Sequence, residues 1–369
     1  MSNNPNLINR FINFVLKPLD KWLIIDMMII YVMSLFLLYS ADGQDFGQLG
    51  RKAVYTVLGL IVMWILAKSR PQFLSNFALP MYIVGLLLLL GVHLFGITVN
   101  GSTRWINLGV RIQPSEIMKI ALPMLLAWYF QRHENILRWY HYVIALILIA
   151  LPVFFILKQP DLGTAILISA SGLFVIFFAG LPWKVIFGAI FAGIISVPLL
   201  WQYGLHDYQR QRILTLFNPE QDRLGAGYHI LQSITAIGSG GFWGKGWLGG
   251  SQTHLAYIPE STTDFIFAVF SEEFGFIGNC ILLILYGIMI ARGLFIAARA
   301  QTLYGQLLAA ALTMTIFCYA FVNMGMVSGI LPVVGVPLPL VSYGGTATLS
   351  IMVILGMLMG ISSHIDKYR

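Results

Sequence analysis

Apolar stretches long enough to cross a lipid bilayer recur along almost the whole chain. A membrane-spanning helix needs about 20 consecutive apolar residues. The mean hydropathy is +0.81, and only 10% of the residues are charged. Because a bilayer holds no water to satisfy free backbone groups, such a chain folds as a bundle of helices. The sequence therefore excludes a soluble globular protein and predicts an all-α polytopic membrane protein with a single domain, residues 1–369.

Ten spans are expected, which places both termini on the same side of the membrane. They cover residues 22–40, 53–67, 77–96, 115–131, 141–157, 163–181, 184–202, 264–291, 305–328 and 343–363. The loops on the side of the termini carry more Lys and Arg than the opposite loops, which include Arg51 and Lys52. By the positive-inside rule both termini are cytoplasmic, and residues 1–21 form a cytoplasmic N-terminal segment. The net charge of +7 is spread over the loops, so it indicates membrane topology and not nucleic-acid binding.

Two segments depart from the pattern of helices and short loops. Residues 203–263 form a long extracytoplasmic connection rich in glycine and aromatic residues, which favours an ordered functional loop over a flexible insertion. Its glycines at 238–251 permit close approach of the backbone to the membrane surface or to a ligand. Residues 329–345 are apolar, yet their prolines and glycines forbid a continuous helix. We expect this broken segment to line a cavity, or alternatively to be a surface loop that dips into lipid.

One carboxylate, Asp264, lies where residues 203–263 meet a long apolar run. We expect Asp264 at the N-terminus of a helix, where unpaired backbone N–H groups and the helix dipole stabilise a negative charge. A charged residue at the membrane boundary carries a desolvation cost, which makes it a functional candidate. Asp264 is the candidate catalytic residue.

Further polar groups interrupt apolar sequence on the same outer side. Glu116 and Lys119 share a helix face, either as a structural ion pair or as part of a site. Asp161 either caps the next helix or takes part in a site. Arg210 and Arg212 suit phosphate, or bind lipid headgroups nonspecifically. The candidate cations on this side are Arg104, Arg210, Arg212 and Lys245.

These residues together fit an amphiphilic substrate with a phosphorylated head and a lipid tail. Carboxylates suit a general base or a divalent cation, and arginines suit phosphate. From the residues alone, the chain either moves such a substrate across the membrane or reacts it.

Five motifs resemble those of the SEDS family, whose members act in shape, elongation, division and sporulation. The motifs are GILPVVGVPLPLVSYGG (329–345), QPSEIMK (113–119), QPDLGTA (159–165), HDYQRQRI (206–213) and PESTTDFIFA (259–268). Within the family the chain resembles the elongation branch more than the division branch. The similarity extends over nearly the whole chain from about residue 25.

The resemblance implies a ten-span peptidoglycan glycosyltransferase that polymerises lipid II at the outer face of the inner membrane. It implies that Asp264 is the essential aspartate, supported by Glu116, Lys119 and Asp161. It also implies a cognate class B penicillin-binding protein, a transpeptidase, as partner, together with other elongation-complex proteins. Ser342, in the Pro-rich motif, is expected to support the substrate site.

A mechanism follows from this resemblance as a hypothesis. The donor linkage is α and the product is β, so a single inversion with one carboxylate base suffices. Asp264 would accept the proton of the acceptor hydroxyl. Arg210, Arg212 and Lys119 would stabilise the departing undecaprenyl pyrophosphate, helped by a divalent cation, Mg or Mn. Glu116 and Asp161 would hold that metal ion or orient Lys119.

Two other functions compete with the enzyme. A lipid II flippase also uses broken helices and intramembrane charges. However, the chain has no detectable inverted repeat, and its charges cluster on one side. A noncatalytic scaffold is disfavoured because buried charges are costly.

Overall fold

The computed structural model describes residue 14 and residues 16–365, except 100–101, 108–110, 205–206, 223–224, 255–257 and 259. Most of the expected N-terminal segment, residues 1–21, lies outside the described residues. The long helices are α2 Lys21–Ala41, α3 Phe46–Lys68, α4 Pro71–Phe95, α5 Pro114–Arg132, α6 Trp139–Leu157, α7 Leu162–Phe178, α8 Trp183–Leu199, α12 Ile266–Arg299, α13 Leu303–Val327 and α14 Gly345–Ser363.

Each expected span corresponds to one of these helices. Among the described residues, seven helices are long and apolar enough to cross a membrane, and α7 and α8 are shorter apolar helices. The remaining one, α5, carries Glu116 and Lys119. The polytopic helical membrane fold is confirmed.

Several expected helix boundaries differ from the structure, and two of these differences concern polar residues near the candidate site. α3 begins at Phe46, because the Asp45 carboxylate accepts a hydrogen bond from the Gly47 N–H at 2.9 Å and caps the helix there. Arg51 and Lys52 therefore lie inside a helix and not in a loop. α12 begins at Ile266, so Asp264 precedes the helix instead of opening it.

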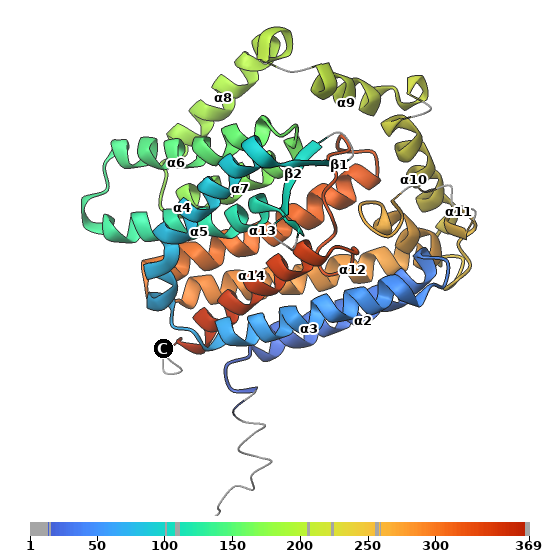
Figure 1. Cartoon of the computed structure of the whole chain (residues 1–369), viewed down its shortest axis with the longest axis horizontal. Coiled ribbons are helices and arrows are strands. Elements are labelled where there is room, and N and C mark those ends of the chain that lie inside the picture. The colour runs from blue at the N-terminus through green and yellow to red at the C-terminus, as the bar shows by residue number, and fades with distance from the viewer. Residues whose placement is uncertain are drawn as a thin grey trace, which may run out of the picture.

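α13 forms the centre of the bundle (Figure 1). It packs against α5, α7, α12 and α14, and most of its residues are buried. Around it, α3 packs along α14, α2 along α12, and α4 along α5. This arrangement brings the turn before α12 and the connection between α13 and α14 together at one end of the central helices.

Three short strands lie between α4 and α5 and add a small sheet to the helical fold. They are β1 Ile97–Val99, β2 Ser102–Asn107 and β3 Arg111–Ile112, paired antiparallel in this order. Ile106 on β2 lies opposite Ile112 on β3. The strand β2 brings Arg104 to the start of α7.

The long connection, residues 203–263, is largely helical where the structure describes it. It begins within the short π-helix η2 Leu200–Gly204 and contains α9 Asp207–Phe217, η3 Pro219–Gln221, α10 Ala226–Gly240 and α11 Ser251–His254. α10 packs on α12. By contrast, no residue of α8 is buried, and α8 and α9 lie apart from the main bundle in Figure 1.

The glycine-rich run after α10 docks on the backbone of α12. The N–H groups of Lys245 and Gly246 donate to the carbonyls of Glu272 and Glu273 at 3.0 and 2.9 Å. A Cβ on Gly244 would overlap the Glu273 carbonyl. Gly244 therefore permits close approach to a helix. The expected approach of the other glycines to the membrane surface or a ligand stays a prediction.

The connection between α13 and α14, residues 328–344, contains no helix. This confirms the expected break in helical structure. Side chains from surrounding helices satisfy its backbone. Lys52 Nζ donates to the Val341 carbonyl at 2.6 Å. The Tyr286 hydroxyl donates to the Pro339 carbonyl at 2.6 Å. Side chains of the protein thus supply hydrogen bonds to backbone carbonyls that have no access to water in apolar surroundings.

Candidate active site

Asp264 lies in a tight turn, residues 260–265, immediately before α12. The N–H groups of Thr263 and Phe265 both donate to the Glu260 carbonyl, at 3.1 and 3.2 Å. Phe265 occupies the N-cap position of α12, and no side chain caps the helix there. Asp264 therefore lies one residue before the N-cap, close to the helix start where the sequence placed it, and its carboxylate does not cap the helix.

Three consecutive carbonyls of this turn accept hydrogen bonds from the broken segment and from α13. The bonds are Tyr343 N–H to Thr262 O at 2.8 Å, Ser342 Oγ to Thr263 O at 2.7 Å and Asn323 Nδ2 to Asp264 O at 2.8 Å. The same amide of Asn323 donates to the Val336 carbonyl at 2.7 Å. One fully buried side chain therefore ties the turn and the broken segment together.

The broken segment passes between Asp264 and the start of α7. Gly335 has a φ of 71°, a conformation that favours glycine. A Cβ on Gly335 would lie 3.3 Å from Asp264 Oδ2. On the α7 side, a Cβ on Gly163 would lie 2.6 Å from the Val334 carbonyl. The absence of side chains at both glycines lets the two elements approach the same stretch of backbone.

Burial raises the pKa of the Asp264 carboxyl from 3.8 to about 6. The nearby carboxylates of Glu260 and Asp161 raise this pKa further, whereas the Arg104 guanidinium lowers it. A carboxyl with this pKa is largely ionised at neutral pH and is a stronger base than an ordinary aspartate. The environment of Asp264 therefore suits proton acceptance.

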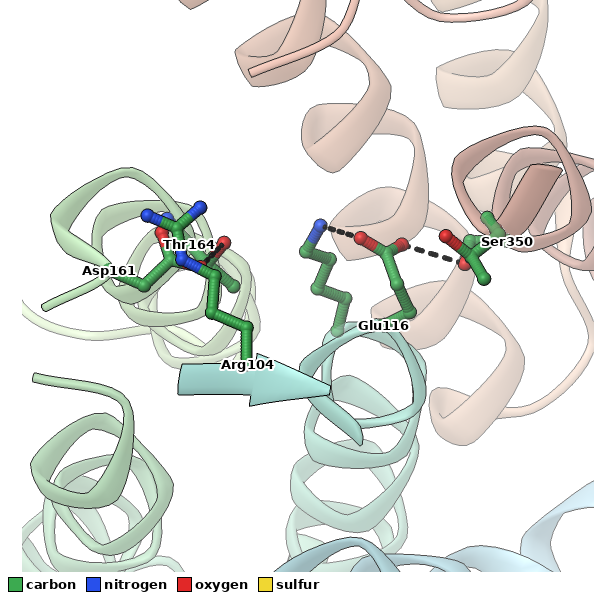
Figure 2. Close-up of polar contacts among 7 residues, drawn as sticks. Arg104, Glu116, Asp161, Thr164 and Ser350 are labelled. Atoms are coloured by element: carbon green, nitrogen blue, oxygen red, sulfur yellow. Dashed lines mark hydrogen bonds and ion pairs between the residues drawn. The ribbon is translucent and has the colours of Figure 1, made fainter. Parts of the chain in front are cut away.

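Asp161 caps α7 and also faces a cation. Its Oδ1 accepts a hydrogen bond from the Thr164 N–H at 3.1 Å, and its Oδ2 accepts one from Thr164 Oγ1 at 2.8 Å. Arg104 Nε lies 3.4 Å from the same Oδ2 (Figure 2). Asp161 is therefore a helix cap, and its charge also acts on Asp264. Its part in a site stays a prediction.

Glu116 and Lys119 form a buried ion pair inside the bundle. Lys119 Nζ lies 2.6 Å from Glu116 Oε1 and 4.6 Å from the centre of the Tyr319 ring. The other carboxylate oxygen of Glu116 accepts a hydrogen bond from Ser350 Oγ at 2.8 Å (Figure 2). This network connects α5 with α13 and α14.

The structure does not bring the remaining predicted cations to Asp264. Arg210 lies on α9, where it donates to the Gln202 carbonyl at 2.9 Å. Arg212 lies on the same helix. Lys245 Nζ lies 2.7 Å from the fully buried carboxylate of Glu272 on α12. Lys245 therefore neutralises a buried charge in this structure.

Sequence reasoning missed two residues that hold the site, Lys52 and Asn323. Lys52 is 2% exposed and anchors the end of the broken segment through Val341. A lysine beside an apolar run is only a weak sign of a buried structural role. Because Lys52 was assigned to a loop, this role was not recognised. Asn323 was a polar residue within an expected span, a pattern that could have identified it.

Comparison with known proteins gives the family. The family model FTSW_RODA_SPOVE, described as "Cell cycle protein", matches residues 14–367. The chain belongs to this family, the SEDS family.

SEDS relatives are similar to this chain over almost its whole length. It is 48% identical to "Peptidoglycan glycosyltransferase MrdB" of Escherichia coli strain K12, covering 99% of this chain and 98% of that protein. It is 34% identical to "Probable peptidoglycan glycosyltransferase FtsW" of Trichlorobacter lovleyi, covering 95% and 94%. The greater similarity to MrdB agrees with the expected elongation branch.

Solved structures show the same SEDS fold. A chain from the structure described as "Structural coordination of polymerization and crosslinking by a peptidoglycan synthase complex" superposes with a TM-score of 0.83 at 31% identity, covering 93% of this chain and 97% of that one. The rod shape determining protein RodA of Thermus thermophilus superposes with a TM-score of 0.71 at 29% identity, covering 95% and 98%.

The carboxylates that the sequence offered as metal ligands are each engaged with protein groups. Both oxygens of Glu116 already accept hydrogen bonds, from Lys119 and Ser350. Both oxygens of Asp161 accept hydrogen bonds from Thr164. Among the described residues, no group of three or more His, Cys, Asp or Glu side chains could hold a metal ion. We derive no catalytic step through a metal on these two residues.

Proposed function

We propose that this chain is a peptidoglycan glycosyltransferase that polymerises lipid II into glycan strands during cell elongation. The activity is the one named for the similar proteins of the family. The observation that carries the proposal is the Asp264 carboxyl, with a pKa of about 6, on a turn fixed by the broken segment and α13. Such a carboxyl is suited to general-base chemistry at neutral pH.

The proposed reaction is a single inverting transfer. Asp264 accepts the proton of the 4-hydroxyl of the terminal GlcNAc of one lipid II. That hydroxyl oxygen forms a bond to the anomeric carbon of MurNAc at the end of the growing chain. The bond from that carbon to undecaprenyl pyrophosphate breaks, and the pyrophosphate leaves with the electron pair. One base suffices for inversion.

The departing pyrophosphate needs positive charge near Asp264. Arg104 is the best-placed candidate, because its guanidinium influences Asp264 directly and its side chain is 25% exposed. Lys119 is buried against Glu116 and would stabilise the leaving group through the field of the site. Arg210 and Arg212 are proposed to contact the pyrophosphate from α9 when lipid II is bound.

A divalent cation, Mg or Mn, remains part of the proposal as a companion of the substrate pyrophosphate. The donor set of Glu116 and Asp161 argues against these residues as its resident ligands. Chelation is therefore expected to lower polymerisation in wild type, and Glu116→Gln is expected to leave the concentration of Mg needed for half-maximal rate unchanged. A large increase in that concentration for the variant would restore the metal-ligand assignment.

We further propose an inner-membrane location with both termini in the cytoplasm, and a class B penicillin-binding protein as partner. The distribution of Lys and Arg over the loops supports this orientation. The similarity to a chain of a peptidoglycan synthase complex supports a partner that crosslinks the product. Co-purification of the full chain with the class B protein of the same cell tests the pairing.

The deciding experiment compares wild type with Asp264→Asn in polymerisation of fluorescent lipid II by the purified complex. Asparagine keeps the shape and removes proton acceptance, so we expect a rate at least about 100-fold lower. Asp45→Asn is a matched control, because asparagine also caps a helix well. Undiminished polymer from Asp264→Asn would refute the assignment of the base. Absence of polymer from wild type with lipid II freely accessible in detergent would favour a flippase.

A further inference from the structure

A large cavity lies at the opposite end of α12 from Asp264. Its volume is about 1270 Å³, and it forms where α2 begins and where α3, α12 and α14 end. With 34 residues at about 1.5 Å each, α12 separates this cavity from the candidate active site by up to roughly 50 Å. Five basic side chains line it: Lys17, Lys21, Lys68, Arg292 and Arg299.

Within the part of the chain that the structure describes, most of this positive charge forms no ion pair with a carboxylate. Arg292 is paired with Asp20, at 2.7 Å between Nη2 and Oδ2. The ion pairs found among the described residues include none with the other four cations of the cavity. Four like charges around one cavity repel each other, and a bound anion would relieve that repulsion.

Three aromatic residues, Phe14, Trp22 and Phe295, line the cavity among these cations. Lys68 Nζ lies 3.4 Å from the centre of the Phe14 ring and 4.2 Å from that of Trp64. The Arg299 guanidinium lies 4.3 Å from the Phe295 ring centre. The Trp22 side chain, also in the lining, is 63% exposed. Cations beside exposed aromatic rings are typical of the level of the lipid headgroups.

We propose that this cavity binds a phosphate-bearing anion at the proposed cytoplasmic surface, with the headgroup of an anionic phospholipid as its source. Topology alone accounts for an excess of Lys and Arg on one side of the membrane. It does not account for the convergence on one cavity of three aromatic side chains and four cations that form no ion pair among the described residues. Clusters of this kind bind anionic headgroups. The inference does not depend on the proposed catalytic function.

The test is a titration of the full-length protein in detergent with phosphatidylglycerol and with phosphatidylcholine, read by native mass spectrometry. Lys68→Gln/Arg299→Gln removes two cavity cations, and Lys184→Gln/Arg138→Gln removes two basic residues of the same proposed side outside the cavity. We expect phosphatidylglycerol to bind the cavity variant about 30-fold more weakly than wild type. This factor corresponds to about 2 kcal/mol, from about 1 kcal/mol per cation.

Two further arms separate the possible results. The charge-preserving variant Lys68→Arg/Arg299→Lys should bind phosphatidylglycerol as wild type does. If the two side chains act only through their exact shape in the fold, this variant should lose binding as well. Inorganic phosphate should not displace the lipid. Displacement would show that the cavity binds anions but that free phosphate, and not the lipid headgroup, is the ligand. Equal binding of the two lipids, or equal weakening by the cavity and control variants, would overturn the proposal.

Discussion

At the residue scale, the surroundings of Asp264 set the pH at which the proposed base works. Burial, reinforced by Glu260 and Asp161, raises the pKa of its carboxyl to about 6, and Arg104 opposes this. Only the ionised carboxylate accepts a proton, so kcat/KM for polymerisation should fall as the pH drops through about 6. Glu260→Gln removes one negative charge and should move the midpoint to lower pH. A profile that stays flat through pH 6 would contradict the assignment.

The same raised pKa has a consequence for stability. Because the folded state favours the protonated carboxyl, ionisation of Asp264 costs stability as the pH rises from 3.8 towards 6. Asp264→Asn is therefore expected to raise the unfolding temperature slightly at neutral pH, although it lowers the polymerisation rate. A lower unfolding temperature would show that the charge contributes to folding.

A second prediction at the residue scale concerns Asn323, a positioning residue. Asn323→Ala leaves the carbonyls of Asp264 and Val336 without their shared donor. Displacement of a reacting group by about 1 Å can cost roughly 100-fold in rate, so kcat should fall by about 10- to 100-fold with little change in KM. Asn279→Ala on α12 serves as the control. An Asn323→Ala enzyme with wild-type kcat would exclude the positioning role.

At the element scale, the buried pair on α5 links three helices, and its removal should be non-additive. Lys119→Met leaves the Glu116 carboxylate buried beside Ser350 without its cation. Breaking a buried pair in this way costs about 3–5 kcal/mol, whereas replacing both partners costs much less. The unfolding temperature of Lys119→Met should therefore be lower than that of the double variant Glu116→Gln/Lys119→Met. If the double variant is stable but inactive, Lys119 also acts on the substrate.

The docking of the glycine-rich run on α12 gives another prediction at this scale. Gly244→Ala should destabilise the protein strongly, because φ is 79° and the new Cβ would overlap the Glu273 carbonyl. Gly246→Ala is the matched control, since φ is 89° but nothing lies within 4 Å. The control should show only the cost of positive φ, about 1–2 kcal/mol. Equal losses for both variants would argue against close docking.

At the scale of the whole molecule, the ten helices fix which polar groups share a side of the membrane. Phe217 at the end of α9 and Trp139 at the start of α6 are both highly exposed. With Cys280 and Cys318 replaced by serine, a membrane-impermeant maleimide should label Phe217→Cys in intact cells. Trp139→Cys should be labelled only after lysis. The reverse pattern would invert the proposed topology and the side of the cavity.

Local sequence was enough to predict the ten long apolar helices and the break between α13 and α14, but not α9, α10 and α11. Apolar length determines a span, and the prolines and glycines of residues 329–345 forbid a helix wherever the segment lies. The sequence motifs were also sufficient to identify the family, and the match to the family model confirms it. Helix boundaries were less predictable, because Lys52 is accommodated in α3 by a carbonyl from a distant segment.

A polytopic helical protein of the SEDS family, with a candidate carboxylate at Asp264, follows from the amino-acid sequence alone. The surroundings of that carboxylate follow only from the packing of the helices. Asn323 and Ser342 hold its turn, and Lys245 lies with Glu272 instead. Such contacts join segments far apart in the chain, so they depend on which helices pack together. Hydropathy and motif spacing indicate which segments form helices, whereas the packing of the helices determines which charged side chains lie together.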